Sequence, residues 1–271
     1  MSHFDVFNGD ADGICALQQL RLDRPCASVA VTGVKRDIAL LRRVDAAPGD
    51  TVTVLDVSLA RNCDALQRLL AAGVSVEYFD HHFAGEVPRH PLLRAHLDPA
   101  PDVCTSVLVD RHLQGRHRAW AVVGAFGDNL PHTAQVLAQA LGLAPAQCAT
   151  LRTLGEAINY NAYGESEADL LVAPARLAQV LRPYASPLAF AAESPLAQAL
   201  ARRQQEDLAL ASGVGPQHVL PGASVVVLPD AAWARRVHGA FANALSRQDD
   251  ARAHAVACPR PGGGWVVSVR A

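Results

Sequence analysis

The sequence has few aromatic residues and no surplus of basic ones. Phe, Trp and Tyr make up 5% of the 271 residues, which disfavours the aromatic platforms that stack long single strands. Lys and Arg number 24 against 26 Asp and Glu, a formal charge of −2. Proteins that contact many phosphates along a duplex usually carry a basic surplus. The composition therefore argues against long duplex DNA as a partner, and it leaves small phosphorylated substrates open.

The chain also lacks a membrane span, a secretory signal and a cysteine framework. No window approaches about 18 uninterrupted apolar residues without charge. The first residues, MSHFDVFNGDADG, carry acids where a signal peptide needs a basic start and an apolar stretch. The six Cys form no CxxC pair and match neither a zinc site nor a disulfide framework. We therefore expect a soluble cytoplasmic protein with reduced thiols and no membrane partner.

Strands and helices are expected to alternate through the first part of the chain. Apolar and β-branched runs predict strands, and the amphipathic segments between them predict helices. This alternation is typical of a mostly parallel sheet with helices on both faces. The expected strands are 4–7, 28–32, 51–55 and 74–79, and the expected helices are 14–22, 38–44 and 63–72.

The rest of the chain is predicted to be mainly helical and then to return to strands. A stretch at 183–195 with three prolines is interpreted as a break. We predict an α/β protein with a catalytic-type sheet domain over 1–185, a helical linker over 186–212 and a small α/β domain over 213–271. The expected helices are 105–113, 120–126, 134–141, 170–181, 196–211 and 233–245, and the expected strands are 223–228 and 265–269.

Acidic and histidine side chains follow the predicted strands where each strand ends. The carboxyl ends of parallel strands meet at one edge of the sheet, and ligands bind at that edge. One further acid lies in the apolar stretch AVVGAFGDN. The residues concerned, in chain order, are Asp10, Asp12, Asp56, Asp80, His81, His82 and Asp128.

Carboxylates gathered in one cleft raise one another's pKa unless a cation neutralises them. Mixed Asp and His ligands suit manganese, with magnesium, cobalt or iron as alternatives. The donors are too many for one ion and suit two ions about 3.5–4 Å apart, with Asp56 as our candidate for the bridge. Taken alone, Asp12 could simply cap the helix that follows it. Burying two His beside an Asp without partners costs several kcal/mol of folding free energy. The acids and histidines taken together therefore favour a metal site.

The motifs DADG, LDVS, FDHH and GDN stand in the order, and at about the spacing, of the DHH phosphoesterase superfamily. The chain resembles this family over residues 8–129, and the remainder resembles its helical linker and small C-terminal domain. Members include RecJ-type exonucleases, nanoRNA and pAp phosphatases, dinucleotide phosphodiesterases and type II pyrophosphatases. The resemblance implies a hydrolase with two divalent ions, manganese first, acting on phosphate esters of short nucleotides through metal-activated water.

The resemblance also implies roles for individual residues. His82 would face the substrate phosphate as a catalytic group, and Asp80 would orient an imidazole. The implied metal ligands are Asp10, Asp12, Asp56, His81 and Asp128.

Two features depart from the family pattern. Val6 stands where many relatives place a metal-binding His, and Asn8 is the residue we expect to fill part of that gap. The glycines at 262–264 are interpreted as a hairpin turn rather than the family's glycine-rich substrate motif. The sequence ends at Ala271, before that motif is expected, which lowers the expectation of efficient polynucleotide processing.

Further candidates for substrate contact lie outside the four motifs. Lys35 and Arg36 follow the second strand, where they either anchor a phosphate or form a solvated pair. Asn159 and Asn161 lie in INYNAYGES, which is either a base-recognition loop or a turn with buried tyrosines. Asn8 joins this group through its place beside the first motif.

Three functions remain open from the sequence. The leading one is a phosphoesterase for linear dinucleotides, nanoRNA or pAp-like molecules. A RecJ-like single-strand exonuclease is the close alternative, and a non-catalytic nucleotide-binding protein that retains the fold is the third. The sequence also leaves open a homodimer.

Overall fold

Five parallel strands form the sheet of the first part of the chain, in the order β2-β1-β3-β4-β5. The computed structural model describes residues 1–271. The chain moves from β1 outward to β2 and then returns to the other side of β1 to form β3, which creates a switch point between β1 and β3. The strands are β1 (His3–Phe7), β2 (Val29–Val31), β3 (Thr51–Leu55), β4 (Ser75–Asp80) and β5 (Leu93–Leu97).

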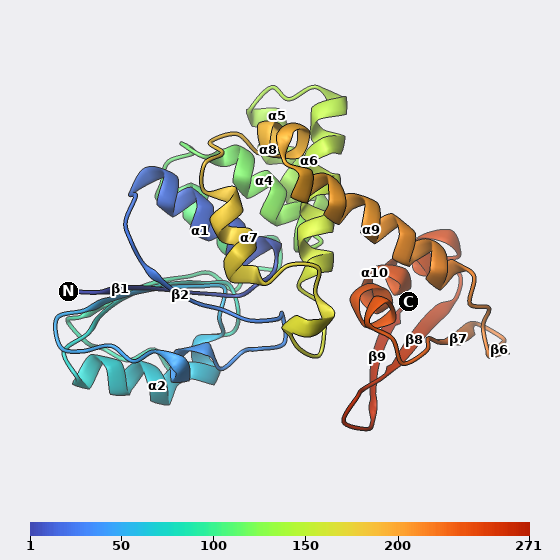
Figure 1. The fold of residues 1–271 in the computed structure, drawn as a ribbon, viewed down its shortest axis with the longest axis horizontal. Helices are drawn as coiled ribbons and strands as arrows, with labels where there is room; N and C mark the ends of the chain where they lie inside the picture. The colour runs from blue at the N-terminus through green and yellow to red at the C-terminus, as the bar shows by residue number, and fades with distance from the viewer.

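Both faces of this sheet are covered, as Figure 1 shows. On one face Val6, Val54 and Tyr78 lie in register and pack against α2 (Leu59–Ala71). On the other face Phe7 and its register partners pack against a layer of helices that begins with α1 (Ala11–Asp23). Burial on both faces explains the nearly continuous apolar strand sequences.

The helical middle of the chain is built around α4, which is almost entirely buried. A Cβ atom at Gly127 would lie 2.3 Å from the Cβ of Ala11 and 2.9 Å from the carbonyl oxygen of Gly155. Glycine therefore lets α4 lie against the start of α1 and against α6 at once. The helices are α3 (Thr105–His112), α4 (Arg118–Gly127), α5 (Pro131–Ala140), α6 (Pro145–Asn161), α7 (Pro174–Leu181) and α8 (Pro187–Glu193).

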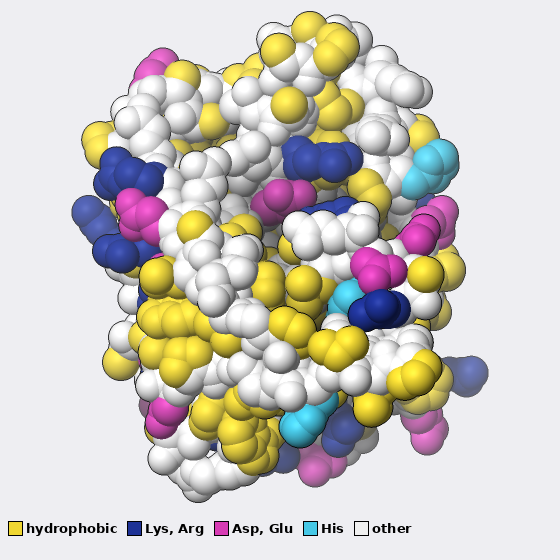
Figure 2. All heavy atoms as spheres, turned by 90° about the vertical axis from the view of Figure 1, so that its right-hand side faces the viewer, with side chains coloured by type: hydrophobic (Ala, Val, Ile, Leu, Met, Phe, Trp, Pro, Cys, Tyr) yellow, Lys and Arg dark blue, Asp and Glu magenta, His cyan; other side chains and the backbone are white.

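A second, mixed sheet forms the end of the chain, in the order β6-β7-β8-β9. One face packs against α10 and shares a core with Tyr160 of α6. In strand β9, the side chains of Val267 and Val269 are each more than half exposed to solvent. Figure 2 shows hydrophobic side chains on this side of the molecule. The elements are α9 (Pro195–Ser212), β6 (His218–Leu220), β7 (Ala223–Val227), α10 (Ala232–Gln248), β8 (Ala253–Pro259) and β9 (Trp265–Arg270).

The α/β class and the parallel sheet are confirmed, and we propose the same division at 1–185, 186–212 and 213–271. In the structure α8 packs among the helices above the first sheet, and α9 runs from them toward the second sheet (Figure 1). The glycines at 262–264 form the turn between antiparallel β8 and β9, where Gly263 and Gly264 have φ of +88° and +81°. None of the helices combines the length and apolar character that a membrane crossing requires.

Several predicted elements were wrong in type or extent. The helix expected over 38–44 is a short 3₁₀ turn, Leu40–Arg43. The expected break at 183–195 contains α8, because Pro187 and Pro195 both occupy first-turn positions that suit proline, and Ser186 caps α8 by accepting from Ala189 N. Strands β5, β6 and β8 were not predicted.

Candidate metal centre

The switch point between β1 and β3 brings the predicted acids and histidines together. Asp10 and Asp12 lie at the start of α1, Asp56 directly follows β3, and Asp128 directly follows α4. A cleft of about 320 Å³ opens here. Its lining includes Asn8, Asp10, Lys35, Asp56, Ser58, Arg61, His81, His82 and Asp128.

Asp10 and Asp12 each accept hydrogen bonds from the beginning of a helix. Asp10 Oδ1 accepts from the backbone N–H of Asp12 and Gly13 at 3.0 and 3.1 Å, so Asp10 caps α1. The two oxygens of Asp12 accept from the N–H groups of Thr105 and Ser106, both at 2.7 Å. Asp12 thus meets the start of α3 rather than capping its own helix. The positive ends of two helices stabilise these buried carboxylates.

His81 is held with one nitrogen toward the acids. Its Nδ1 donates to the carbonyl of Val103 at 2.9 Å, which leaves the electron pair of a neutral ring on Nε2. Nε2 lies 3.4 Å from Asp56 Oδ1, 3.8 Å from Asp128 Oδ2 and 4.0 Å from Asp12 Oδ2. A carbonyl behind one ring nitrogen and anionic oxygens before the other is the usual setting of a metal-ligating histidine.

Asp56 is held in an uncommon backbone conformation. Its φ is +59°, in the left-handed region, which costs on the order of 1 kcal/mol for a residue with a side chain. Its N–H donates to the carbonyl of Phe79 at 3.0 Å, and Thr105 Oγ1 donates to its Oδ1 at 3.4 Å. The turn places the carboxylate at the centre of the cluster. Strain at such a position is characteristic of functional sites.

The electrostatics of these clustered side chains suit a bound divalent cation. Burial, with Asp10 and Asp12 nearby, raises the pKa of Asp56 well above its usual range. Burial and the charge of Asp12 raise the pKa of Asp128 to about 7. Carboxylates behave in this way when they are crowded without a neutralising ion. Two groups of three donors share His81, one with Asp12 and Asp128 and the other with Asp56 and His82, and both match the ligand preferences of manganese.

His82 and Asp80 form a second pair beside the cluster. Asp80, fully buried, accepts from His82 Nδ1 at 2.7 Å, and its other oxygen accepts from the N–H of Leu59 at 3.2 Å. The hydrogen bond to Asp80 raises the pKa of His82. His82 is 45% exposed in the cleft, so its outer edge faces solvent while Asp80 fixes the ring. This is the geometry of an oriented imidazole.

Lys35 lies inside the acidic cluster. Its Nζ is 2.6 Å from Asp10 Oδ2 and 3.6 Å from Asp128 Oδ1. Nζ also donates to Asn159 Oδ1 at 3.3 Å and stands 5.6 Å from the ring centroid of Tyr163. Burial opposes the charge of Lys35, but Asp10 outweighs it, so the pKa of Lys35 is raised well above its usual range. The sequence indicated this sheet edge for Lys35, but not these partners.

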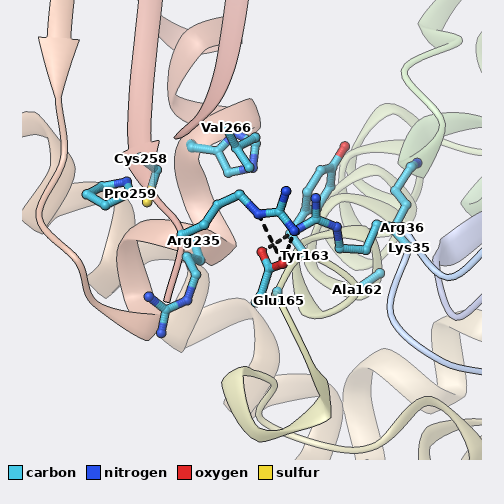
Figure 3. Close-up of a pocket in the computed structure, with 12 residues that line it drawn as sticks. Lys35, Arg36, Ala162, Tyr163, Glu165, Arg235, Cys258, Pro259 and Val266 are labelled. Carbon is cyan, nitrogen blue, oxygen red and sulfur yellow. Dashed lines mark hydrogen bonds and ion pairs between the residues drawn. The ribbon is translucent and has the colours of Figure 1, made fainter. Parts of the chain in front are cut away.

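Arg36 points away from the metal cleft. It forms an ion pair with Glu165, which also accepts from Arg260, directly after β8, at 2.6 and 3.1 Å (Figure 3). These residues line a pocket of about 240 Å³, together with Lys35, Tyr163, Arg235 and His238. The stretch INYNAYGES, singled out in the sequence, contains Glu165, but its pairing with Arg36 and Arg260 could not be predicted, because the pocket joins segments far apart in the chain.

The remaining predicted contacts divide into two kinds. Asn159 contacts Lys35 and lines a neighbouring pocket of about 230 Å³. Asn161 is fully buried, and its amide bonds the backbone of Leu171 and Val172, so it is not free to meet a substrate. The expected recognition loop fails at this point because α6 continues through Asn161. Asn8, also buried, bonds Asp10 N and the carbonyl of Lys35.

Comparison with known proteins gives structural likeness without sequence matches. No protein-family model matches the chain, and no curated protein sequence matches it. RecJ from Thermus thermophilus, solved with Mn²⁺, has a TM-score of 0.53 and 16% identity over 95% of this chain. A pGpG-specific phosphodiesterase, PggH from Vibrio cholerae, has a TM-score of 0.52 and 12% identity over 95% of this chain.

The two relatives differ in how much of their own length is matched. The chain covers 43% of that RecJ chain and 78% of PggH. Both likenesses extend through the first sheet, the helical middle and the small second sheet of this protein, since each covers nearly all of it. The chain therefore has the fold of these two proteins along almost its whole length.

Proposed function

We propose that this chain is a divalent-metal-dependent phosphoesterase, with manganese preferred, that hydrolyses phosphate esters of short nucleotides. The observation that carries the proposal is the set of Asp12, Asp56, His81 and Asp128 gathered at the switch point of the sheet. The Mn²⁺ complex of RecJ and the phosphodiesterase PggH support this chemistry through their shared fold.

A divalent cation, when bound, supplies hydroxide near neutral pH and neutralises charge on a phosphoryl group. The protein's own groups supply the rest. Asp80 holds the ring of His82 through Nδ1, so the opposite nitrogen is the one left for a substrate. As an imidazolium, His82 donates a hydrogen bond to a phosphate oxygen or a proton to the leaving oxygen. Asp80 acts only through His82.

The pocket beside Lys35 supports a short substrate. Its lining carries Arg36 and Arg260, which share the single carboxylate of Glu165 and so leave positive charge for a phosphate, and Tyr163, which offers a ring face. Arg235 also lines it but pairs with Asp169 and Asp230. Its volume of about 240 Å³ lies below the roughly 300–1,000 Å³ of most small-molecule sites. Because Lys35 lines both this pocket and the metal cleft, one small ligand would reach both. A linear dinucleotide, a nanoRNA end or a pAp-like molecule meets this description.

The test is a panel of substrates with the manganese-loaded protein. We expect faster turnover of linear dinucleotides and pAp than of a 20-nucleotide RNA, a cyclic dinucleotide or pyrophosphate. Faster digestion of the 20-mer would favour the RecJ-like exonuclease, and binding without turnover would favour the non-catalytic alternative. Asp56→Asn and His81→Ala should lose activity by at least about 100-fold. Asp64→Asn, on the exposed side of α2, is the matched control and should keep it.

A further inference from the structure

Two groups of side chains in the acidic cluster could hold a cation, and both groups need His81. His81 Nε2, Asp12 and Asp128 offer ligand atoms within 4.8 Å of one another, and Asp56 Oδ1 lies 3.4 Å from His81 Nε2. The other group is Asp56 with His81 and His82, and because it uses the same histidine, the two groups do not make two independent sites. A second ion would have to share Asp56 and use Asp10. The number of ions therefore depends on what else surrounds Asp10.

No third protein donor is available beside Asp10. Val6 is fully buried in the core between the sheet and α2. The amide oxygen of Asn8 accepts from Asp10 N at 3.2 Å, and its amide nitrogen donates to the carbonyl of Lys35 at 3.4 Å. His82 Nδ1 is taken by Asp80, and the opposite ring nitrogen is the one assigned to the substrate. Two carboxylates fall short of the three protein ligands that open catalytic metal sites usually keep.

We infer that this chain binds a single divalent cation and that the ammonium group of Lys35 takes the place of the second. Lys35 Nζ lies 2.6 Å from Asp10 Oδ2 and 3.6 Å from Asp128 Oδ1, which is where a second positive charge is needed. The inference deepens the proposed function and rests on its metal site. It replaces the expectation of two ions with one ion and one fixed charge.

Lys35 is anchored in this position from outside the cluster. Its N–H donates to the carbonyl of Ala162 at 2.9 Å, and Nζ donates to Asn159 Oδ1. Asp10 and Asp128 form ion pairs with Nζ from the cluster side, and Asn159 holds it from the other side. The ring of Tyr163 adds a cation–π contact. Asp10 is only 2% exposed, and a buried carboxylate of this kind needs such a partner.

The experiment is calorimetric titration of the chelator-treated full chain with Mn²⁺, read together with the electron paramagnetic resonance spectrum. We expect one ion per chain and the six-line spectrum of an isolated Mn²⁺. Two ions per chain with an exchange-coupled spectrum would overturn the inference and leave the proposed function standing. Absence of any bound Mn²⁺ would instead remove the metal site and the proposed function with it.

Substitutions at Lys35 test its part directly. Lys35→Gln removes the charge and offers an amide oxygen, so a second, weaker Mn²⁺ should bind and couple magnetically to the first. Lys35→Arg keeps the charge and should remain at one ion. Arg36→Gln removes a neighbouring positive charge that pairs with Glu165 and not with the acidic cluster. This variant should also bind one Mn²⁺ per chain. A Lys35→Gln chain that folds and still holds one ion would contradict the role assigned to Lys35.

Discussion

Asp56 lies among other carboxylates, and burial together with these neighbours raises its pKa. Its backbone also adopts a left-handed conformation that few residues with a side chain tolerate. Asn shares the tolerance of Asp for left-handed φ, so Asp56→Asn changes the charge and leaves the turn intact. Removing this like charge should stabilise the metal-free protein by about 1 kcal/mol, as substitutions at charge-crowded functional sites commonly do.

The same substitution should abolish the stabilisation by Mn²⁺. Urea unfolding with chelator and then with excess Mn²⁺ measures both effects, with Asp64→Asn as the control that changes neither. A metal-free Asp56→Asn protein that is less stable than its parent would show that charge crowding is not the dominant feature of this site.

The sequence located the residues whose position follows from a strand end. Asp56, His81 and Asp10 directly follow or stand close to strands, so the parallel sheet alone brings them to one edge. The sequence could not show the partners of Glu165 or the buried state of Asn161, because both depend on how α6 continues and on contacts between distant segments. Local pattern carries no information about such partners.

At the scale of elements, the close approach of α4 to α1 and α6 sets the position of Asp128. Gly127→Ala would place a methyl group 2.3 Å from the Cβ of Ala11. Overpacking of this kind costs typically 1–3 kcal/mol, against about 1 kcal/mol gained in helix propensity. We expect a net loss of stability and at least a tenfold weaker affinity for Mn²⁺, since α4 carries Asp128 and α1 carries Asp12.

Thermal unfolding and Mn²⁺ titration of the variant check this expectation. Gly215→Ala is the matched control, because nothing lies within 4 Å of a Cβ atom at Gly215. Unchanged metal affinity in Gly127→Ala would mean that the helices adjust without moving the ligands. A separate result at the scale of elements concerns Pro187. This proline begins helix α8 in a stretch whose composition indicated a break.

At the scale of the whole molecule, His238 lies between the two parts of the chain. Its Nδ1 bonds Ser268 Oγ at 2.8 Å, and its ring meets Tyr163 edge to face. Burial first, and then Arg36 and Arg270, lowers the pKa of His238 from 6.5 to about 4. Protonation therefore favours the unfolded chain. The stability tied to neutral His238 is complete above pH 6.5 and is lost as the pH falls from 6.5 toward 4.

By this linkage, the change from pH 7 to pH 5 should remove about 2 kcal/mol from the free energy of unfolding. His238→Asn should flatten that part of the profile, and urea titrations across the range measure it. Exposed His132 serves as the control, because His132→Asn should leave the profile unchanged. An equal pH dependence in the His238→Asn protein would exclude His238 as its source.

The ligands of the cluster come from four separate places between Asp12 and Asp128, each at the end of a strand or helix. They meet only after β4 has paired with β3 and α4 has packed against α1, so an unfolded or half-folded chain offers no comparable site to the ion. Free metal at about 100 times its dissociation constant then adds about 2.7 kcal/mol to the native state alone. If the proposed site holds manganese, the ion in this way stabilises the folded protein in addition to any part it takes in the reaction.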